Sequence, residues 1–164
     1  LSKKPETPSR AMFAVYPRIC TVAEVKLKKS GRRLRVFNTH FDHVGTEARR
    51  NSALLIIDKI KEIAGTHPAM MTGDFNVSEE WEAYKTITSN EFVLKDAWKI
   101  AGKQSGENYT FHDFGRVPVA EREKIDFIFV TPQIKVADAE IISSAITDST
   151  YLSDHNAHLA DLEF

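Results

Sequence analysis

The pattern of apolar and polar residues predicts a two-stranded hairpin near the start of the chain. Over 18–28 apolar residues alternate with lysines, which is the two-residue period of a half-buried strand. These apolar residues are Ile19, Val25 and Leu27. Residues 29–32 predict a turn and 33–42 the second, antiparallel strand. One face of that second strand becomes polar at its end, and this face carries Leu34, Val36, Asn38, His40 and Asp42.

A helix and a buried strand are predicted next. Residues 46–64 carry an apolar stripe at helical spacing, which predicts an amphipathic helix. The stripe consists of Ala53, Ile56, Ile57, Ile60 and Ile63. Gly65 and Pro68 end the helix. The apolar run that follows predicts a strand over 69–75.

A second, shorter helix is predicted over 79–88. We expect Ser78 to cap it, with Trp81 and Tyr84 facing inward. Residues 101–123 have few periodic apolar positions and several glycines and charges, so they predict a long loop. Loops of that length inside a domain are usually functional or mobile.

Three further strands complete the predicted domain. They cover 125–130, 134–142 and 157–164. Prolines interrupt 1–17, which we interpret as an irregular N-terminal segment, so the domain itself is expected over 18–164. Strands outnumber helices in this order, which favours an α+β layered fold over a helical bundle.

Length and charge exclude several classes of protein. The 164 residues fit one domain, and 22 Lys and Arg against 23 Asp and Glu give no overall field that attracts a polyanion. The single Cys20 excludes an internal disulfide. No apolar run reaches the length of about 20 residues that a membrane helix needs. The first residue is Leu1, so we leave localisation open.

Polar residues follow the buried strand at Gly73-Asp74-Phe75-Asn76. A carboxylate and a carboxamide are costly at the mouth of such a strand unless they have partners or a use. A turn that leads into the next helix would explain the same residue types. Other stretches must therefore decide between a site and a turn.

Further polar residues lie at or near strand ends. Asp126 stands inside an apolar strand, where an unpaired carboxylate costs several kcal/mol, so it needs a partner. Asn38 and His40 end the hairpin strand, and Asp154 precedes the last strand. Taken singly, His40 is more often a structural histidine and Asp154 a turn residue. We expect one edge of a sheet to gather these side chains.

Chemistry favours one combination of these residues. Asp74, Asn76 and Asp154 offer oxygen atoms that suit Mg²⁺ or Mn²⁺, which prefer one or two carboxylates, waters and a substrate phosphate. His155 beside Asp126 predicts an imidazole held by a carboxylate, which can bind a phosphate or transfer its proton. With His40, these groups suit metal-assisted attack of water on phosphorus.

Two other chemistries fit less well. A zinc site would need the remaining histidines at fixed ligand spacing, which they lack. A serine hydrolase would need a serine on a strained turn, and the chain has no Gly-x-Ser-x-Gly motif.

Four motifs in order resemble the endonuclease/exonuclease/phosphatase superfamily. They are Val36-Phe37-Asn38-Thr39-His40-Phe41-Asp42, Gly73-Asp74-Phe75-Asn76, Lys124-Ile125-Asp126-Phe127-Ile128-Phe129 and Ser153-Asp154-His155. The stretch from His40 to Arg50 is similar to a bacterial branch of that superfamily. The resemblance implies a four-layered α-β-β-α sandwich of mainly antiparallel sheets. It also implies a metal-dependent hydrolase of phosphate esters.

The resemblance implies a role for each matching residue. His40 would contact the phosphate and protonate the leaving group, while Asp74 would orient or deprotonate the water, with Asn76 beside the phosphate. The metal ligand would be Asp154. His155, oriented by Asp126, would stabilise the transition state.

The resemblance also implies substrate contacts outside the central motifs. Tyr109 and Phe111 belong to a stretch similar to the aromatic segment that lines the cleft in several members. Arg18 lies in a similar motif before the first strand and would contact a phosphate. We assign Asn38, at the same strand end as His40, to the substrate as well.

One departure from the family pattern concerns the principal metal ligand. Members have N-terminal strands that supply an Asn and a metal-binding Glu. Glu6 lies in a proline-rich stretch and Glu24 in the hairpin, so neither matches that Glu. We therefore expect the N-terminal strands and the N-terminal half of the domain to be missing.

Two hypotheses of function follow. The first is a Mg²⁺-dependent phosphodiesterase, nuclease or phosphatase whose present chain is weakly active or inactive alone. The second is a non-catalytic fragment or binding module that keeps the scaffold. The substrate could be a nucleic acid, a nucleotide, a lipid or a sugar phosphate, since these activities share the motifs.

Overall fold

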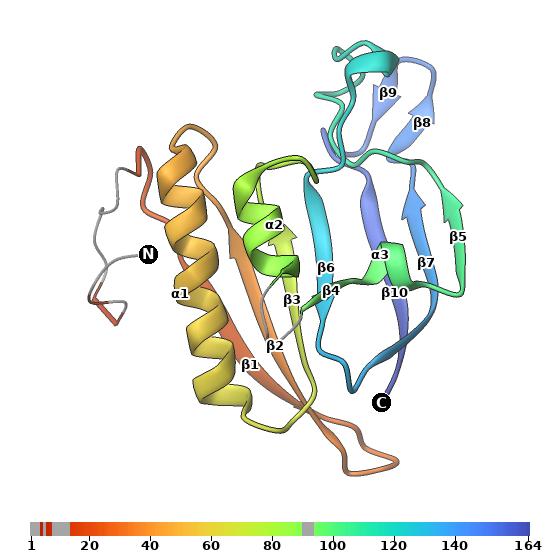
Figure 1. Ribbon diagram of the computed structural model, residues 1–164. Coiled ribbons are helices and arrows are strands. Elements are labelled where there is room, and N and C mark those ends of the chain that lie inside the picture. Colours follow the sequence, from red (N-terminus) through yellow and green to blue (C-terminus); the bar gives the residue numbers. More distant parts are fainter. Residues whose placement is uncertain (1–3, 5, 8–13, 90–93) are drawn as a thin grey trace.

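The chain forms two stacked β-sheets, with the two longer helices over one of them (Figure 1). The computed structural model describes residues 4, 6–7, 14–89 and 94–164. A five-stranded sheet has the order β1-β2-β3-β6-β4, a three-stranded sheet the order β10-β7-β5, and β8 pairs with β9. The strands are β1 (Cys20–Lys26), β2 (Arg33–His40), β3 (Ala69–Asp74), β4 (Lys95–Asp96), β5 (Lys103–Gly106), β6 (Asp126–Val130), β7 (Lys135–Ile142), β8 (Ala145–Thr147), β9 (Thr150–Tyr151) and β10 (Ala157–Glu163). The helices are α1 (Thr46–Ala64), α2 (Glu82–Thr88), α3 (Ala97–Ile100) and the 3-10 turn η1 (Val119–Glu121).

The pairing is mainly antiparallel, as predicted. Among the pairs formed by the described strands, β2 with β3 and β5 with β7 are parallel, and the others are antiparallel. Together with the helices this gives the mixed α+β class that the sequence predicts. The absence of N-terminal strands is not confirmed and stays a prediction.

The main core lies between the helices and the five-stranded sheet. The apolar stripe of α1 and the buried face of α2 pack on aromatic side chains from β2 and β6 and from the turns that follow β2 and β3. Phe75 is fully buried, with Phe41 and Phe129 in edge-on contact at ring distances of 5.0 and 5.1 Å. Each buried side chain of this size stabilises the fold by about 1.5–3 kcal/mol. This core fixes the ends of β2, β3 and β6 relative to one another.

A smaller core joins the two sheets. It contains Leu34, Ala97, Ile128, Val130, Ile134 and Val136. In contrast, β1 is exposed along nearly its whole length, with Val22 41% and Val25 42% exposed. The prediction of a half-buried first strand is therefore wrong for its burial, because β1 is an edge strand of this sheet.

Several predicted elements need correction. The predicted cap Ser78 is wrong: α2 starts at Glu82 after Trp81, and no side chain caps it. Trp81 is 43% exposed, with the guanidinium of Arg49 over its ring, so only Tyr84 of the predicted pair faces inward. The predicted loop over 101–123 contains β5 and η1. Strand β5 has the sequence Lys-Gln-Ser-Gly and is exposed, so no apolar pattern marks it.

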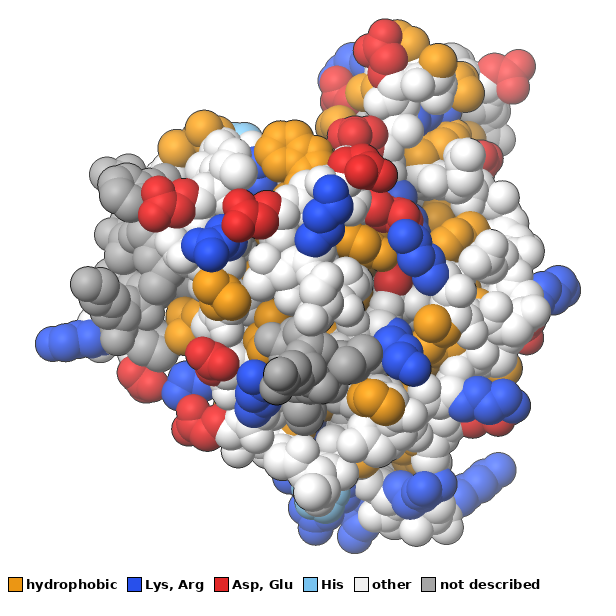
Figure 2. All heavy atoms as spheres, viewed as in Figure 1, with side chains coloured by type: hydrophobic (Ala, Val, Ile, Leu, Met, Phe, Trp, Pro, Cys, Tyr) orange, Lys and Arg blue, Asp and Glu red, His pale blue; other side chains and the backbone are white. Residues whose placement is uncertain are grey.

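The outer surface carries charges of both signs (Figure 2). On the face drawn in Figure 2, basic and acidic side chains are interspersed. Among the residues that the structure describes, every helix is too short or too polar to cross a bilayer.

Asp42 joins the N-terminal segment to the start of α1. Its Oδ2 accepts hydrogen bonds from the backbone N–H of Val15 and Tyr16 at 2.8 and 2.9 Å. Its Oδ1 accepts from Val44 and Gly45 at 2.8 and 2.7 Å. Asp42 is 2% exposed. Burial acts to raise the pKa of this carboxyl, but the four backbone donors outweigh it and hold the pKa well below its usual range. Asp42 therefore does not share the polar face of the hairpin strand and has a structural role.

We predict that Asp42→Asn lowers the free energy of unfolding at pH 7 by about 2–4 kcal/mol, because an amide leaves backbone donors without an acceptor. The pKa of Asp42 is lower in the folded than in the unfolded chain. The stabilisation that the ionised carboxylate provides is therefore complete above the unfolded pKa of about 4, and it is lost as the pH falls through the folded pKa. Urea denaturation at pH 7 and pH 3 measures both effects. The exposed helix residue Asp58 supplies the control Asp58→Asn. An equal decrease in the free energy of unfolding in Asp42→Asn and Asp58→Asn would contradict the structural role of Asp42.

Candidate active site

The register of the five-stranded sheet places three polar residues side by side. His40 is the last residue of β2, Asp74 the last of β3 and Asp126 the first of β6. His40 pairs with Asp74, and Asp74 pairs with Asp126. Directly opposite residues on neighbouring strands project on the same face with Cβ atoms about 4.5–5.5 Å apart. The three side chains therefore form one row across the end of the sheet.

Gly73 allows β3 to run close to β2 just before this row. Its φ is +150°, and a Cβ on Gly73 would lie 1.7 Å from the carbonyl oxygen of Thr39. Only glycine fits such a close approach to backbone. The glycine of the Gly73-Asp74-Phe75-Asn76 motif thus has a steric reason, and it brings Asp74 opposite His40.

A tight turn after β3 fixes the Asp74 side chain. Its Oδ1 accepts a hydrogen bond from the backbone N–H of Asn76 at 2.8 Å. Asn76 adopts φ +49°, and its Nδ2 donates to the carbonyl of Phe41 at 3.0 Å. Asn76 therefore ties the end of β2 to the turn after β3. Asp74 Oδ2 remains for the imidazoles on either side.

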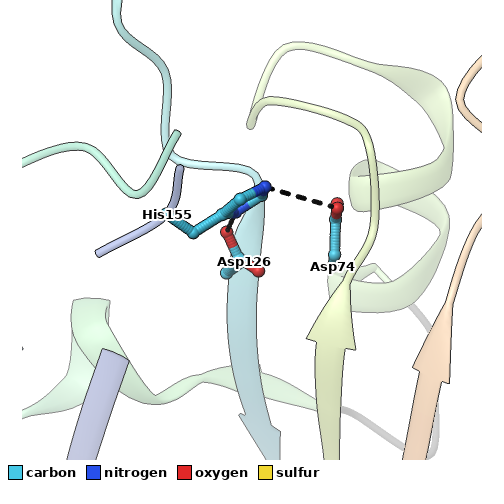
Figure 3. Close-up of side chains that lie close together, drawn as sticks. All are labelled: Asp74, Asp126 and His155. Atoms are coloured by element: carbon cyan, nitrogen blue, oxygen red, sulfur yellow. Dashed lines mark hydrogen bonds and ion pairs between the residues drawn. The ribbon is translucent and has the colours of Figure 1, made fainter. Parts of the chain in front are cut away.

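His40 and His155 both approach Asp74 Oδ2. The Nε2 of His40 lies 3.2 Å from that oxygen and the Nε2 of His155 lies 3.9 Å from it. The Nδ1 of His155 lies 2.7 Å from Asp126 Oδ2, so it carries a proton and donates to the carboxylate. Figure 3 shows the imidazole of His155 between the two aspartates. The predicted pair of His155 and Asp126 is thus present in the structure.

The surroundings change the acidity of these groups in different directions. Burial raises the pKa of Asp74, and the neighbouring Asp126 raises it further, while the Asn76 N–H and the imidazoles act in the opposite direction. The hydrogen bond to Asp126 raises the pKa of His155. Burial lowers the pKa of His40, although Asp74 opposes this. His155 is therefore the imidazole that holds a positive charge more readily.

Some of these residues could hold a metal ion. One ligand atom each from Asp74, Asp126 and His155 lie within 4.8 Å of one another. The carboxylate oxygens suit a hard divalent cation, whereas the Nδ1 of His155 is already bonded to Asp126. The donor set thus fits such an ion through its oxygen atoms.

Asp154, the predicted metal ligand, is not in this converging set. Its Oδ1 accepts a hydrogen bond from Ser153 Oγ at 3.3 Å, and its carbonyl accepts from the backbone N–H of His112 at 3.1 Å. It lies on the same loop as His155. Its role as a ligand stays a prediction.

Three of the four predicted substrate residues line two different cavities. Arg18 and Asn38 line a cavity of about 220 Å³ together with His40. Asn38 Nδ2 donates to Thr72 Oγ1 at 2.9 Å. Tyr109 lines a different cavity of about 450 Å³ beside the β8–β9 hairpin, where its hydroxyl accepts from Arg122 at 2.7 Å.

Phe111 is the predicted aromatic residue that reaches the row. Its ring centroid lies 5.0 Å from that of His155, and its backbone forms an isolated bridge with His155. The two aromatic residues of this stretch therefore lie in different surroundings, Phe111 beside His155 and Tyr109 beside the hairpin.

Buried polar residues that the sequence did not single out hold the loop that carries His155. His112 is 1% exposed; its Nδ1 accepts from the backbone N–H of Gly115, so its Nε2–H donates to Ser144 Oγ at 2.9 Å. Ser144 Oγ in turn donates to the carbonyl of Ser153 at 3.1 Å. This chain of bonds holds the loop that carries His155. No spacing in the sequence marks it, because His112 is 32 residues from Ser144 and Ser144 is 9 residues from Ser153.

Lys124, also missed, anchors the strand that starts with Asp126. Its Nζ lies 3.0 Å from Glu79 and 3.3 Å from Asp96, and the side chain is 7% exposed. The sequence signals were its place directly before a strongly apolar strand and at the start of the third family motif.

Solved structures resemble the chain closely. An endonuclease/exonuclease/phosphatase from Bacteroides vulgatus is 57% identical with a TM-score of 0.89, and the match covers 94% of this chain and 59% of that one. A mannosyl-6-phosphatase from Bacteroides thetaiotaomicron is 33% identical with a TM-score of 0.89, covering 99% and 63%. The human Nocturnin catalytic domain, at 22% identity and a TM-score of 0.71 over 91% and 54%, shares the fold. The chain thus spans less than two thirds of these proteins.

The family is shown by the sequence as well as by the fold. No curated protein matches the chain. The sequence pattern of the Endonuclease/Exonuclease/phosphatase family matches residues 4–155. That range includes all four strand-end and loop motifs, and the residues of the row occupy those motifs. The chain therefore belongs to the Endonuclease/Exonuclease/phosphatase family.

Proposed function

We propose that the row at the end of the five-stranded sheet hydrolyses phosphate esters by attack of water on phosphorus. The observation that carries this proposal is the arrangement of two imidazoles around one carboxylate oxygen, with a second carboxylate behind one of them. Such a site offers both a group that accepts a proton and groups that neutralise phosphoryl charge. The family membership supports the same class of reaction.

Each residue has a role that its contacts support. Asp74, with its raised pKa and central position, orients the water and accepts its proton. His155, whose pKa is raised by its hydrogen bond to Asp126, stabilises the negative charge that develops on phosphoryl oxygens. His40, at the exposed end of the row, donates a proton to the leaving oxygen. Asn76 lies beside the phosphate and keeps the turn of Asp74 in place.

We propose Mg²⁺, or Mn²⁺ in its place, as the cofactor, with Asp154 as a ligand. A bound divalent cation neutralises charge on the phosphoryl oxygens. The carboxylates of Asp74 and Asp126 accept bonds from backbone or imidazole donors, whereas Asp154 accepts a longer bond of 3.3 Å from Ser153 Oγ and is more easily turned toward a metal. Each of these carboxylates thus has one oxygen engaged in such a bond. For this reason we propose that the isolated chain binds metal weakly and turns over slowly.

We propose a small sugar phosphate as the substrate. The neighbour at 33% identity is named as a mannosyl-6-phosphatase. The cavity beside His40 is about 220 Å³ and is lined by polar Asn38, Thr21 and Arg18, which suits one small polar ring better than a polymer. The formal net charge of −1 gives no long-range attraction to nucleic acid.

The alternative function is a non-catalytic scaffold. Its support is that neither Glu6 nor Glu24 matches the principal metal ligand of the family. A direct test incubates the chain with a hexose 6-phosphate, p-nitrophenyl phosphate and bis-p-nitrophenyl phosphate in the presence of Mg²⁺, and measures phosphate or nitrophenol release. Release from the monoesters is expected. No release from any ester at millimolar Mg²⁺ would favour the scaffold.

Asp126→Asn is expected to lower kcat by about a hundredfold or more, since removing a positioned acid–base group costs at least that much. The reason is that His155 loses the carboxylate that raises its pKa and fixes its ring. The measurement is initial rate against substrate concentration, with thermal unfolding to verify the fold and Asp58→Asn as the matched control. Activity within twofold of the parent chain would contradict the assigned role.

Removal of metal with EDTA is expected to abolish hydrolysis, and added Mg²⁺ to restore it. In Asp154→Asn the Mg²⁺ concentration that gives half of the maximal rate should rise about tenfold, because one charged ligand is lost. Asp148→Asn, on the neighbouring hairpin, serves as control. Hydrolysis that persists in EDTA would rule out the proposed cofactor.

A further inference from the structure

Thr110 lies between the strand that begins with Asp126 and the loop that carries His155. It is fully buried. Its Oγ1 accepts hydrogen bonds from the backbone N–H of Ile125 and of Asp126, both at 3.0 Å. A single hydroxyl therefore holds the point at which the strand carrying Asp126 begins.

The backbone of Thr110 holds the loop that carries His155. Its carbonyl accepts from the N–H of Asn156, the residue after His155, at 2.7 Å. The next residue, Phe111, bridges to His155, and the two rings are tilted to one another with centroids 5.0 Å apart. The N–H groups of Thr110 and Phe111 both donate to the carbonyl of Glu123 at 3.0 Å. Thr110 and Phe111 are thus bonded both to Glu123, just before β6, and to the loop of His155.

We propose that Thr110 is a positioning residue that sets the distance between Asp126 and His155. The proposal rests on the proposed function for its effect on catalysis. Asp126 and His155 are 29 residues apart in sequence. Asp126 begins β6 and His155 lies on the loop before β10, yet His155 Nδ1 lies 2.7 Å from Asp126 Oδ2. A hydrogen bond of that length tolerates displacements of only a few tenths of an ångström. Thr110 is bonded to Asp126 itself and to the residue next to His155.

A purely structural role makes a different prediction. If Thr110 only satisfied buried donors, its loss would lower stability without changing the pair of side chains. A positioning role requires that the bond between His155 and Asp126 weakens while the remaining fold persists. The two roles therefore differ in what happens to the proton on His155 Nδ1.

The chain offers a matched pair of variants. Thr110→Val keeps the shape of the side chain but has no acceptor, whereas Thr110→Ser keeps the hydroxyl and loses a methyl group. We expect Thr110→Val to lower kcat at least about tenfold with KM changed less than twofold, since a small displacement of catalytic groups has effects of this size or larger. Thr110→Ser should stay within about threefold of the parent chain.

Proton NMR separates this proposal from the proposed function. The Nδ1 proton of His155, identified by its absence in His155→Gln, should give a downfield signal in the parent chain and in Thr110→Ser, and should lose or shift it in Thr110→Val. This readout needs no turnover, so it stands even if no ester is hydrolysed. An unchanged signal and kcat in a folded Thr110→Val would overturn the proposal. Equal losses in Thr110→Ser and Thr110→Val would also overturn it, because they would point to packing.

A measurement on the parent chain covers the case in which Thr110→Val fails to fold. Amide hydrogen exchange at Ile125, Asp126 and Asn156 should be slow and of similar protection, because one residue holds all three groups. Exchange at Asp126 as fast as at an exposed loop amide would overturn the proposal.

Discussion

The register of β3 against its two neighbours is the constraint on which the site depends. It places His40, Asp74 and Asp126 in one row at the end of the sheet. A slip by one residue would turn each side chain to the opposite face. Gly73 makes this register possible, because any side chain there would collide with the carbonyl of Thr39. The aromatic core beneath the row, centred on Phe75, holds the strands in that register.

The second half of the site is held by buried polar contacts instead of sheet pairing. The loop with His155 is bonded through Thr110 on one side and through His112 and Ser144 on the other. Buried hydrogen bonds of this kind fix geometry strongly, since an unpaired buried donor is costly. Asp126 is the point where both halves meet, because it belongs to the row and bonds to His155.

Sequence reasoning found the residues of the row because each is a polar group at the end of an apolar strand. Asp74, Asp126 and His155 were predicted together, and the structure brings them together. Helix α1 was predicted to the residue, since its apolar stripe is long and regular. The supporting residues were not found. Asp42 and Thr110 bond to backbone groups, and His112 to the hydroxyl of Ser144, all far away in sequence, which no periodic pattern can show.

The errors have physical reasons of the same kind. Strand β5 has no apolar residue, and the burial of β1 depends on what covers it, so neither could be predicted from periodicity. Trp81 was expected in the core, but it lies at the surface under the guanidinium of Arg49. Tyr109 and Phe111 are two residues apart, yet only Phe111 contacts His155. A resemblance transfers a motif more reliably than the surroundings of each residue.

The central claim is that water attacks phosphorus at the row formed by His40, Asp74 and Asp126 with His155. Hydrolysis of a hexose 6-phosphate in ¹⁸O-labelled water, followed by mass spectrometry of both products, tests it most directly. The account predicts that the label enters the inorganic phosphate and that the sugar keeps its original oxygen. Label in the sugar would mean cleavage of the carbon–oxygen bond and would contradict the account.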